Sequence, residues 1–230
     1  MRRAELKILR KLPLFCDMNQ RHFDRLMKNA LLQWFPAHTE LIRERELPDY
    51  LHILVDGMVE LFATRGGQSA TIDILQPITA FIIAAVVRDE LYLNGARTLT
   101  PARILLIQAN TIRSVFSEDT VFARAVVSEL ATRYRAVIQV LKNDRIGNST
   151  DRVLNWIARE DIRQHRKGSI QIPFDKRILA SYLGMRPENL SRAFQTLRRH
   201  GIIVHGKTLL IKDRKSFRRL VRPSVLFANN

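Results

Sequence analysis

The sequence predicts an α+β fold made of an N-terminal antiparallel β-roll of the double-stranded β-helix type, a long helix and a C-terminal winged helix-turn-helix. Short apolar runs alternate with turn signals from residue 31 to residue 107, which is typical of short antiparallel strands. Residues 119–145 contain neither proline nor glycine, and residues 175–211 give two short helices followed by a hairpin. We expect domains at residues 1–118, 119–146 and 147–230.

The N-terminal part begins with helices and continues with strands. Apolar residues recur at helical spacing between residues 4 and 30, for example Leu6, Leu9 and Leu12. Apolar runs follow at residues 51–55, 59–62, 71–75, 96–99 and 103–107, with turns at Asp56-Gly57 and at residues 65–68. About eight short antiparallel strands closing into a roll would accommodate this pattern.

The long helix carries an apolar seam with alternating steps of three and four residues. Such a seam is typical of a helix that pairs with a second copy of itself, although a helix packed against its own domain gives the same stripe. Residues 147–149 break the helix and mark a hinge, and residues 150–166 read as a further helix. The seam consists of Val127, Leu130, Tyr134, Val137 and Leu141.

The C-terminal part has the pattern of two helices joined by a tight turn. Asp175 stands where it can cap the first helix, and Gly184 supplies the left-handed residue between the helices. Pro187 suits the first turn of the second helix, where a missing amide hydrogen costs nothing. Residues 202–204 and 208–211 form a hairpin, which we interpret as a wing with Lys207 at its tip.

The second helix has two different faces. Leu190, Ala193, Phe194 and Leu197 share the apolar face. The other face holds side chains that can read base edges in the major groove, because glutamate accepts from cytosine, arginine binds guanine through two acceptors and serine can serve either role. Sequence-specific DNA binding is therefore expected from the polar face, which consists of Glu188, Ser191, Arg192, Gln195 and Arg199.

The distribution of charge agrees with a polyanionic partner. The net charge is +16, and residues 148–230 hold 18 Lys and Arg against 6 Asp and Glu, giving +12. Residues 1–147 hold 20 against 16, giving +4. A concentrated positive field favours nucleic acid by releasing its counterions.

Several other classes of protein are not expected from the composition. No run of about 18 apolar residues occurs and no signal peptide follows the basic start, so we expect a cytoplasmic protein without a membrane span. Cys16 is the one cysteine in the sequence, which excludes a disulfide within the chain and a cysteine cage for a metal or an iron–sulfur cluster. No nucleophile–base pair, metal-ligand cluster or phosphate-binding glycine loop is apparent, so an enzyme is not expected.

The order of these parts resembles the CRP/FNR superfamily of bacterial transcription regulators over nearly the whole chain. Residues 13–15, 35–37, 51–57 and 102–107 are similar to successive landmarks of the family's cyclic-nucleotide-binding-like roll, and residues 184–201 are similar to its recognition helix. The resemblance implies a homodimer that binds promoter DNA, with RNA polymerase as a further partner and activation as the usual outcome.

The recognition helix is similar to the FNR-like branch of the family, which has a glutamate, two further residues and then serine-arginine. The resemblance implies a TTGA-type half-site in an inverted repeat, where Arg192 takes guanine, Glu188 the opposing cytosine and Ser191 a neighbouring thymine. Arg186 stands where the family often has a capping serine or threonine. The residues expected to contact the DNA backbone are Lys176, Arg177, Arg186 and Lys207.

The roll departs from the cyclic-nucleotide branch at both places that hold the ligand there. Residues 76–85 lack the family's Gly-Glu pair, and Tyr92-Leu93 stands where Arg-Ser would hold the phosphate. A cyclic phosphate would meet no cation in that slot, so cyclic AMP is not expected. The iron–sulfur cluster of FNR is not expected either, because its N-terminal cysteines are absent.

What the roll senses is left open by the sequence. Residues 81–87 are strongly apolar, which suits a core filled by its own side chains, a hydrophobic ligand or haem. Phe81, Ile83, Tyr92 and Leu93 are the candidate pocket residues. His22, His38 and His52 are candidate haem ligands, with Cys16 and Met58 less suited, and His52 lies in an alternating strand where a structural histidine is also expected.

The leading interpretation is a homodimeric transcription regulator controlled through its roll. Regulators of low oxygen and nitric oxide related to FNR also lack cysteine clusters, so a haem-dependent gas sensor is one hypothesis for the signal. The alternatives are a regulator that responds to a cyclic nucleotide and a regulator with an empty roll that needs no effector.

Overall fold

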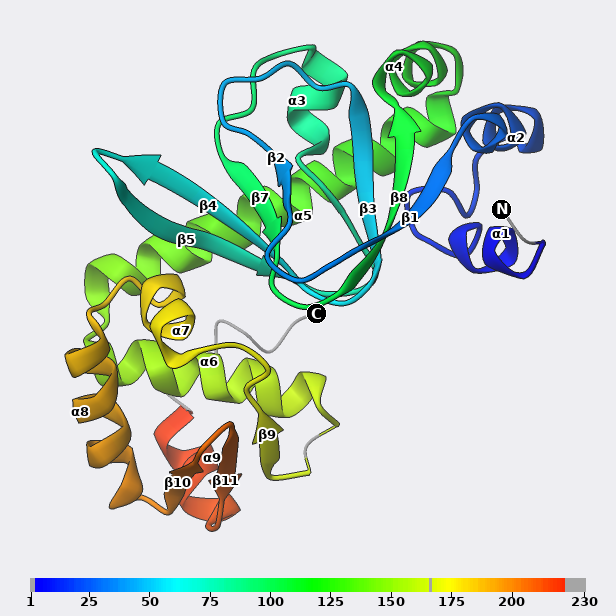
Figure 1. Cartoon of the computed structure of the whole chain (residues 1–230). Helices are drawn as coiled ribbons and strands as arrows, with labels where there is room; N and C mark the ends of the chain where they lie inside the picture. The colour runs from blue at the N-terminus through cyan, green and yellow to red at the C-terminus, as the bar shows by residue number, and fades with distance from the viewer. Residues whose placement is uncertain (1–2, 166, 222–230) are drawn as a thin grey trace. The chain divides into compact units, whose positions relative to one another are not determined.

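The computed structural model describes residues 3–165 and 167–221 of the chain. It divides into two compact units, Met1–Val137 and Ile138–Asn230. Helix α5 (Thr120–Ile146) continues across this division (Figure 1). Within the described ranges, no helix is long and apolar enough to cross a membrane.

The N-terminal unit is built around two antiparallel sheets, which confirms the predicted roll (Figure 1). The first sheet has the strand order β1-β8-β3-β6 and the second the order β2-β7-β4-β5, so residues 31–108 contribute eight strands. The strands are β1 (Leu31–Phe35), β2 (Glu40–Ile42), β3 (Tyr50–Asp56), β4 (Val59–Arg65), β5 (Gln68–Leu75), β6 (Thr79–Phe81), β7 (Gly95–Thr98) and β8 (Ala102–Gln108).

Alternation along the strands gives this unit two apolar cores. Leu51 and Ile53 of β3 belong to a core shared with the helices, whereas Leu54 belongs to a core formed by residues of both sheets. Because side chains alternate between the two faces of a strand, one short strand supplies both cores. The helices that contribute to the first core include α2 (Gln20–Lys28), α4 (Ala109–Glu118) and the first turns of α5, and α1 (Arg3–Leu9) contributes Leu9.

Helix α3 (Ile83–Arg88) was not expected from the sequence. Ile82 precedes it with a left-handed backbone (φ 56°), an uncommon conformation for a β-branched residue. Ile83 and Val86 are each 1% exposed, so this apolar segment turns back onto the core instead of extending as a strand. Six residues are too few for helical periodicity to be recognised in a sequence.

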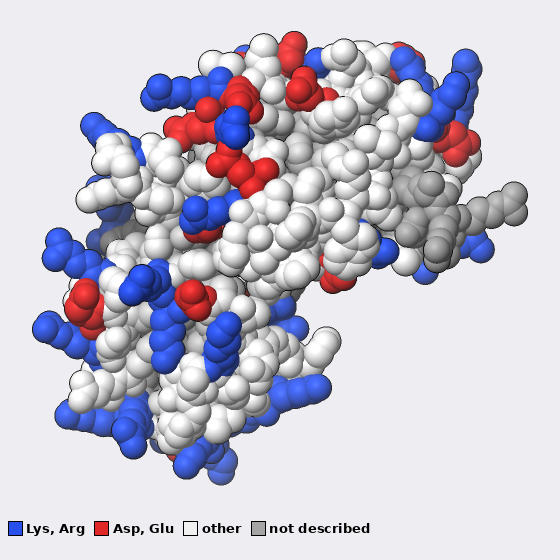
Figure 2. Space-filling model, viewed as in Figure 1, with Lys and Arg blue, Asp and Glu red and all other residues white. Residues whose placement is uncertain are grey.

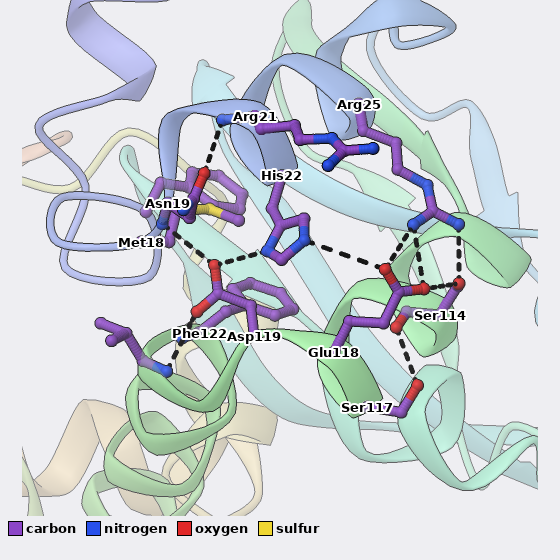
Figure 3. A network of polar contacts seen from close by, with 12 residues as sticks. Met18, Asn19, Arg21, His22, Arg25, Ser114, Ser117, Glu118, Asp119 and Phe122 are labelled. Atoms are coloured by element: carbon purple, nitrogen blue, oxygen red, sulfur yellow. Dashed lines mark hydrogen bonds and ion pairs between the residues drawn. The ribbon is translucent and has the colours of Figure 1, made fainter.

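A buried carboxylate, Asp119, fixes the start of α5 (Figure 3). Its Oδ1 accepts hydrogen bonds from the amides of Val121 and Phe122, each 3.0 Å long, which is the arrangement of a helix N-cap. Its Oδ2 accepts from the amide of Asn19 at 3.0 Å and lies 2.9 Å from Nδ1 of His22. A single side chain therefore joins α5 to the start of α2.

The neighbouring residues strengthen this junction. Glu118 receives a bond of 2.7 Å from the Ser114 hydroxyl and two bonds from Arg25 of α2, at 2.8 and 2.9 Å (Figure 3). The Ser114 and Arg25 bonds lower the pKa of Glu118. Burial alone would raise the pKa of Asp119, but its bonds from Phe122 and the other donors outweigh burial and hold the pKa below its usual value.

The C-terminal unit is a winged helix-turn-helix, as predicted, with two elements that the sequence did not indicate. The unexpected elements are strand β9 (Ser169–Gln171) and the basic helix α9 (Arg214–Val221). Strand β9 joins the wing strands in a sheet of order β10-β11-β9. The remaining elements are α6 (Ser149–Arg163), α7 (Lys176–Tyr182), α8 (Pro187–Arg198), β10 (Ile202–His205) and β11 (Thr208–Ile211).

Replacing Asp119 with alanine is expected to lower the free energy of unfolding by about 2 to 4 kcal/mol. The substitution removes the N-cap of α5 and leaves the buried amide of Phe122 without an acceptor. Urea unfolding of the full chain, followed by circular dichroism, measures the change.

Asn19→Ala is the matched control for this prediction. The Asn19 side chain caps α2 through the amide of Arg21 at 2.8 Å, but it is exposed, and within the described part of the chain this local bond is its only one. We expect a loss of about 1 kcal/mol. Equal losses for the two variants would contradict a role for Asp119 in joining α2 to α5.

Candidate nucleic-acid interface

Gly184 determines the turn between α7 and α8. Its φ of 60° lies in the left-handed region that favours glycine. The Gly184 amide donates to the carbonyl of Ser181 and the Met185 amide to the carbonyl of Ala180, both at 3.0 Å. This pair of bonds is a Schellman motif, which ends α7 and directs the chain into α8.

Neither α7 nor α8 has a side-chain cap at its start. Asp175 occupies the N-cap position of α7, but its side chain makes no capping hydrogen bond, so the predicted cap is wrong in this respect. Arg186 is the N-cap of α8 and also makes no side-chain cap bond, as expected for a residue in place of serine or threonine. Pro187 begins α8 as predicted, with a pre-set φ.

The apolar face of α8 is buried. Leu190, Ala193 and Leu197 are exposed by only 1–2%, and the helix contacts α6, α7 and β10. Phe194 differs from the expectation, because it is half-buried at the edge of this face and lines a surface groove. Burial of the other three residues fixes the rotation of the helix about its axis, and therefore which side chains point outward.

The outward face presents the three predicted base-reading residues. Glu188 and Arg192 are exposed, and neither side chain makes an ion pair or hydrogen bond with residues 3–165 or 167–221. The Ser191 hydroxyl donates to the carbonyl of Pro187 at 3.0 Å. Ser191 thus has its oxygen lone pairs available as acceptors, while its hydrogen is engaged.

The wing is a two-residue hairpin whose tip carries Lys207. His205 and Thr208 pair directly in the register of β10 and β11. Gly206 has a left-handed φ of 59°, which the tight turn requires. Lys207 is exposed at the tip, and its carbonyl accepts from the amide of Ile172 at 2.7 Å.

Two hollows are lined by residues that are expected to contact the DNA backbone. Lys176, Arg177 and Lys207 line a hollow of about 360 Å³ beside the wing. Lys176 and Arg177 also line a groove of about 680 Å³ between α8 and β10, together with Ser191. Arg186 lines neither hollow, although it is exposed at the start of α8.

The surface of this unit is strongly basic. Figure 2 shows Lys and Arg side chains spread over its visible face, with few Asp or Glu among them. The sequence did not indicate that α9 adds to this charge, and Arg218 and Arg219 lie in its last turn. Asp213 marks the start of α9 by accepting from the amides of Lys215 and Ser216, a capping signal that the sequence contains.

The seam of the long helix is mostly exposed in the single chain. Leu130 is half-buried and packs against the core of the roll. The other four residues are exposed by 49–67%, and they are Val127, Tyr134, Val137 and Leu141.

The four candidate pocket residues do not line one common hollow. Phe81 and Tyr92 are buried in the core formed by the two sheets, whereas Ile83 belongs to the core shared with the helices. Leu93 is 85% exposed. Burial raises the pKa of Tyr92 to about 12, and its hydroxyl lies 3.4 Å from the carbonyl of Tyr50.

The candidate haem ligands lie in separate parts of the unit. His22 is engaged with Asp119, and His38 is exposed in the turn between β1 and β2. His52 is buried against the Phe81 ring at 5.3 Å, and burial lowers its pKa to about 4. Its Nδ1 has no hydrogen-bond partner in the described part of the chain.

The two further candidates are less suited to haem. Cys16 is exposed, and its thiol donates a hydrogen bond to the carboxylate of Asp17. Met58 is half-buried. A search of the described residues finds no group of three or more His, Cys, Asp or Glu that could hold a metal ion.

Comparison with solved structures shows how widely this fold is shared. A candidate cAMP-binding regulatory protein from Silicibacter pomeroyi DSS-3 is 24% identical, with 95% of this chain and 98% of that chain covered and a TM-score of 0.64. FixK2 from Bradyrhizobium japonicum is 18% identical over 83% and 96% of the two chains, with a TM-score of 0.74. The c-di-GMP-responsive regulator CLP of Xanthomonas campestris is 15% identical over 85% and 100%, with a TM-score of 0.69.

Family models identify both halves of the chain. No curated protein is significantly similar to the sequence. Residues 32–119 match the cyclic nucleotide-binding domain, and residues 151–220 match the Crp-like helix-turn-helix domain. With these two domains in this order and a fold shared with CRP/FNR-type proteins, the chain belongs to the CRP/FNR superfamily and is a DNA-binding transcription regulator.

Proposed function

We propose that the protein is a homodimer that reads a TTGA-like inverted repeat through α8. The observation that carries this proposal is the outward face of α8, where Glu188 and Arg192 are exposed and have no partner among the described residues. A charged side chain held on a rigid helix without an internal partner is available to a base edge. Buried apolar residues on the opposite face keep α8 from turning these groups away.

The chemistry of the three residues fits the G·C pair of TTGA and the T·A pair that precedes it. Arg192 can donate two bonds to guanine, and Glu188 can accept from the amino group of the paired cytosine. The Ser191 hydrogen is engaged with Pro187, so its oxygen is suited to accept from the adenine amino group of the neighbouring T·A pair. The family resemblance implies a contact of Ser191 with thymine, whereas the engaged hydroxyl hydrogen favours the adenine of the same T·A pair.

Backbone contacts would come from the hollow beside the wing. Lys176 and Arg177 are exposed at the start of α7, and Lys207 faces the same hollow from the wing. Cations placed together on two elements can bind consecutive phosphates, which orients a protein on the duplex without reading its sequence. Arg186 would add a separate phosphate contact at the start of α8.

The seam on α5 supports a two-fold dimer. Four large apolar or aromatic residues at heptad spacing are exposed in the single chain. Burying them against a second copy would remove this apolar surface from water. Two symmetry-related copies of α8 would then read two half-sites in inverted order.

Control through the roll is supported by its connections to α5. Asp119 caps the helix at its start, and Arg133 donates to the carbonyl of Ala80 immediately before the buried Phe81. A signal that moved the segment around Phe81 would therefore reach the helix that carries the dimer seam. Any such effector must bind one arrangement of this segment better than another.

Two proposals about the signal follow. Tyr92 is buried at the position where the family resemblance places a phosphate-binding arginine, which supports a regulator that does not respond to cyclic AMP. The buried, unpartnered Nδ1 of His52 supports the second proposal, a haem-dependent response to low oxygen or nitric oxide, because neutral imidazole is the form that ligates iron. The remaining alternative is a filled roll without an effector.

We propose that the protein regulates transcription and does not catalyse a reaction. The family consists of such regulators. We infer RNA polymerase as a partner and activation as the outcome from the family resemblance alone. Transcription by purified polymerase from a promoter with the inverted repeat should increase when the protein is added, and a decrease would indicate a repressor.

Arg192→Ala should weaken binding to a TTGA inverted repeat by about 1 to 3 kcal/mol and remove the preference for guanine at one position. The reason is that the guanidinium is the group able to bind two acceptors on that base. Gel-shift titration against the repeat and against versions with the guanine replaced measures both effects.

Lys207→Ala is the matched control, because it removes a cation that is expected to contact phosphate only. We expect weaker binding to every sequence alike and a shallower salt dependence, by about one unit in the slope of log K against log salt. Loss of base preference in the Lys207 variant, or its retention in the Arg192 variant, would contradict the assigned roles.

Val137→Glu should convert the protein to monomers, because the new charge would be buried against its copy in the dimer seam. Sedimentation equilibrium measures the mass, and affinity for the inverted repeat should fall with it. Thr132→Glu places the same charge at an exposed position on the opposite side of α5 and should leave a dimer. A dimeric Val137 variant would refute the proposed interface.

Titration of the full chain with cyclic AMP should give no saturable heat and no change in gel-shift affinity, because Tyr92 offers the phosphate no positive charge.

Titration with haem tests the proposal of a haem-dependent response. A Soret band that disappears in His52→Ala supports haem sensing through this residue. A wild-type chain that shows no Soret band after haem is added eliminates haem sensing. Saturable binding of cyclic AMP would overturn the proposal that the protein does not respond to this nucleotide.

A further inference from the structure

Gln195 lies on the base-reading face of α8 but was not among the residues assigned to bases. At about 100° per residue, it falls between Ser191 and Arg192 in angle around the helix and within about 20° of Glu188. It is exposed, and its amide makes no hydrogen bond with residues 3–165 or 167–221. Buried Leu190, Ala193 and Leu197 hold it on this side as they hold the other three residues.

The surroundings of Gln195 are those of a nucleic-acid contact. It lines the groove of about 680 Å³ between α8 and β10 together with Ser191 and Arg198. Lys176 and Arg177 line the same groove from α7. The amide is therefore close to cations that can hold phosphates, in the same hollow as a residue already assigned to a base.

The spacing places Gln195 beyond the bases read by the first turns of α8. Four residues of helix rise about 6 Å from Ser191 to Gln195. Base pairs are stacked about 3.4 Å apart, so the amide lies within about two base pairs of the pair that Ser191 reads. A glutamine amide offers one donor and one acceptor side by side, which matches the N7 and N6 edge of adenine.

We propose that Gln195 is a fourth specificity-determining residue, which selects adenine at a base pair that flanks the TTGA-like half-site. The proposal rests on the proposed function, because it assumes that α8 enters the major groove. It extends each half-site by one position that the FNR-like pattern of glutamate, serine and arginine does not specify.

The test is competition gel shift of the full-length protein with a fixed TTGA inverted repeat whose flanking base pairs are changed one at a time and symmetrically. Wild type should prefer A·T at one flanking position by about 10-fold. Gln195→Ala should lose this preference while keeping its discrimination within TTGA. Gln195→Glu should move the preference to cytosine at the same position, because a carboxylate accepts from the cytosine amino group.

Asn189→Ala is the matched control, since it removes an exposed amide from the same helix at about 100° from Glu188. It should keep the flanking preference of wild type. The inference is overturned if wild type shows no flanking preference, or if Gln195→Ala keeps it, while TTGA is still selected. If TTGA itself is not selected, the proposed function fails first, and the inference fails with it.

Discussion

The burial of one face of α8 is the constraint on which the interface depends. Leu190, Ala193 and Leu197 have almost no exposed surface, and the helix cannot rotate without exposing them. Because buried side chains of this size each contribute on the order of 1 kcal/mol or more, rotation is costly. The polar residues on the other side are consequently held outward even though two of them have no internal partner. The packing, and not a polar network, therefore orients the reading face.

The N-terminal unit uses a polar constraint for a similar purpose. Asp119 receives hydrogen bonds from three amides and contacts His22, so the start of α5 is attached to the start of α2 (Figure 3). Arg133 attaches the middle of the same helix to the segment around Phe81. The helix with the exposed apolar seam is thus fixed to the segment around Phe81, which would give the proposed control of the proposed dimer a physical route.

The sequence predicted the elements whose signals are local or strongly periodic. Gly184, Pro187 and the 3.6-residue period identified α8, and Gly206 identified the wing turn. Strand β9 was missed because three residues carry no period, and its stability comes from pairing with β11. The apolar run that became α3 could not be distinguished from the lining of a pocket, since apolar residues serve both. The Asn148–Asp151 capping box, which starts α6, is a local signal that the sequence contains.

Whether paired copies of α8 read an inverted repeat is tested most directly by selection of binding sites from random DNA with the full-length wild-type protein. We expect enrichment of two TTGA-like half-sites in inverted order, with centres about one helical turn apart. Enrichment of a single half-site, of a direct repeat or of no sequence at all would contradict this expectation.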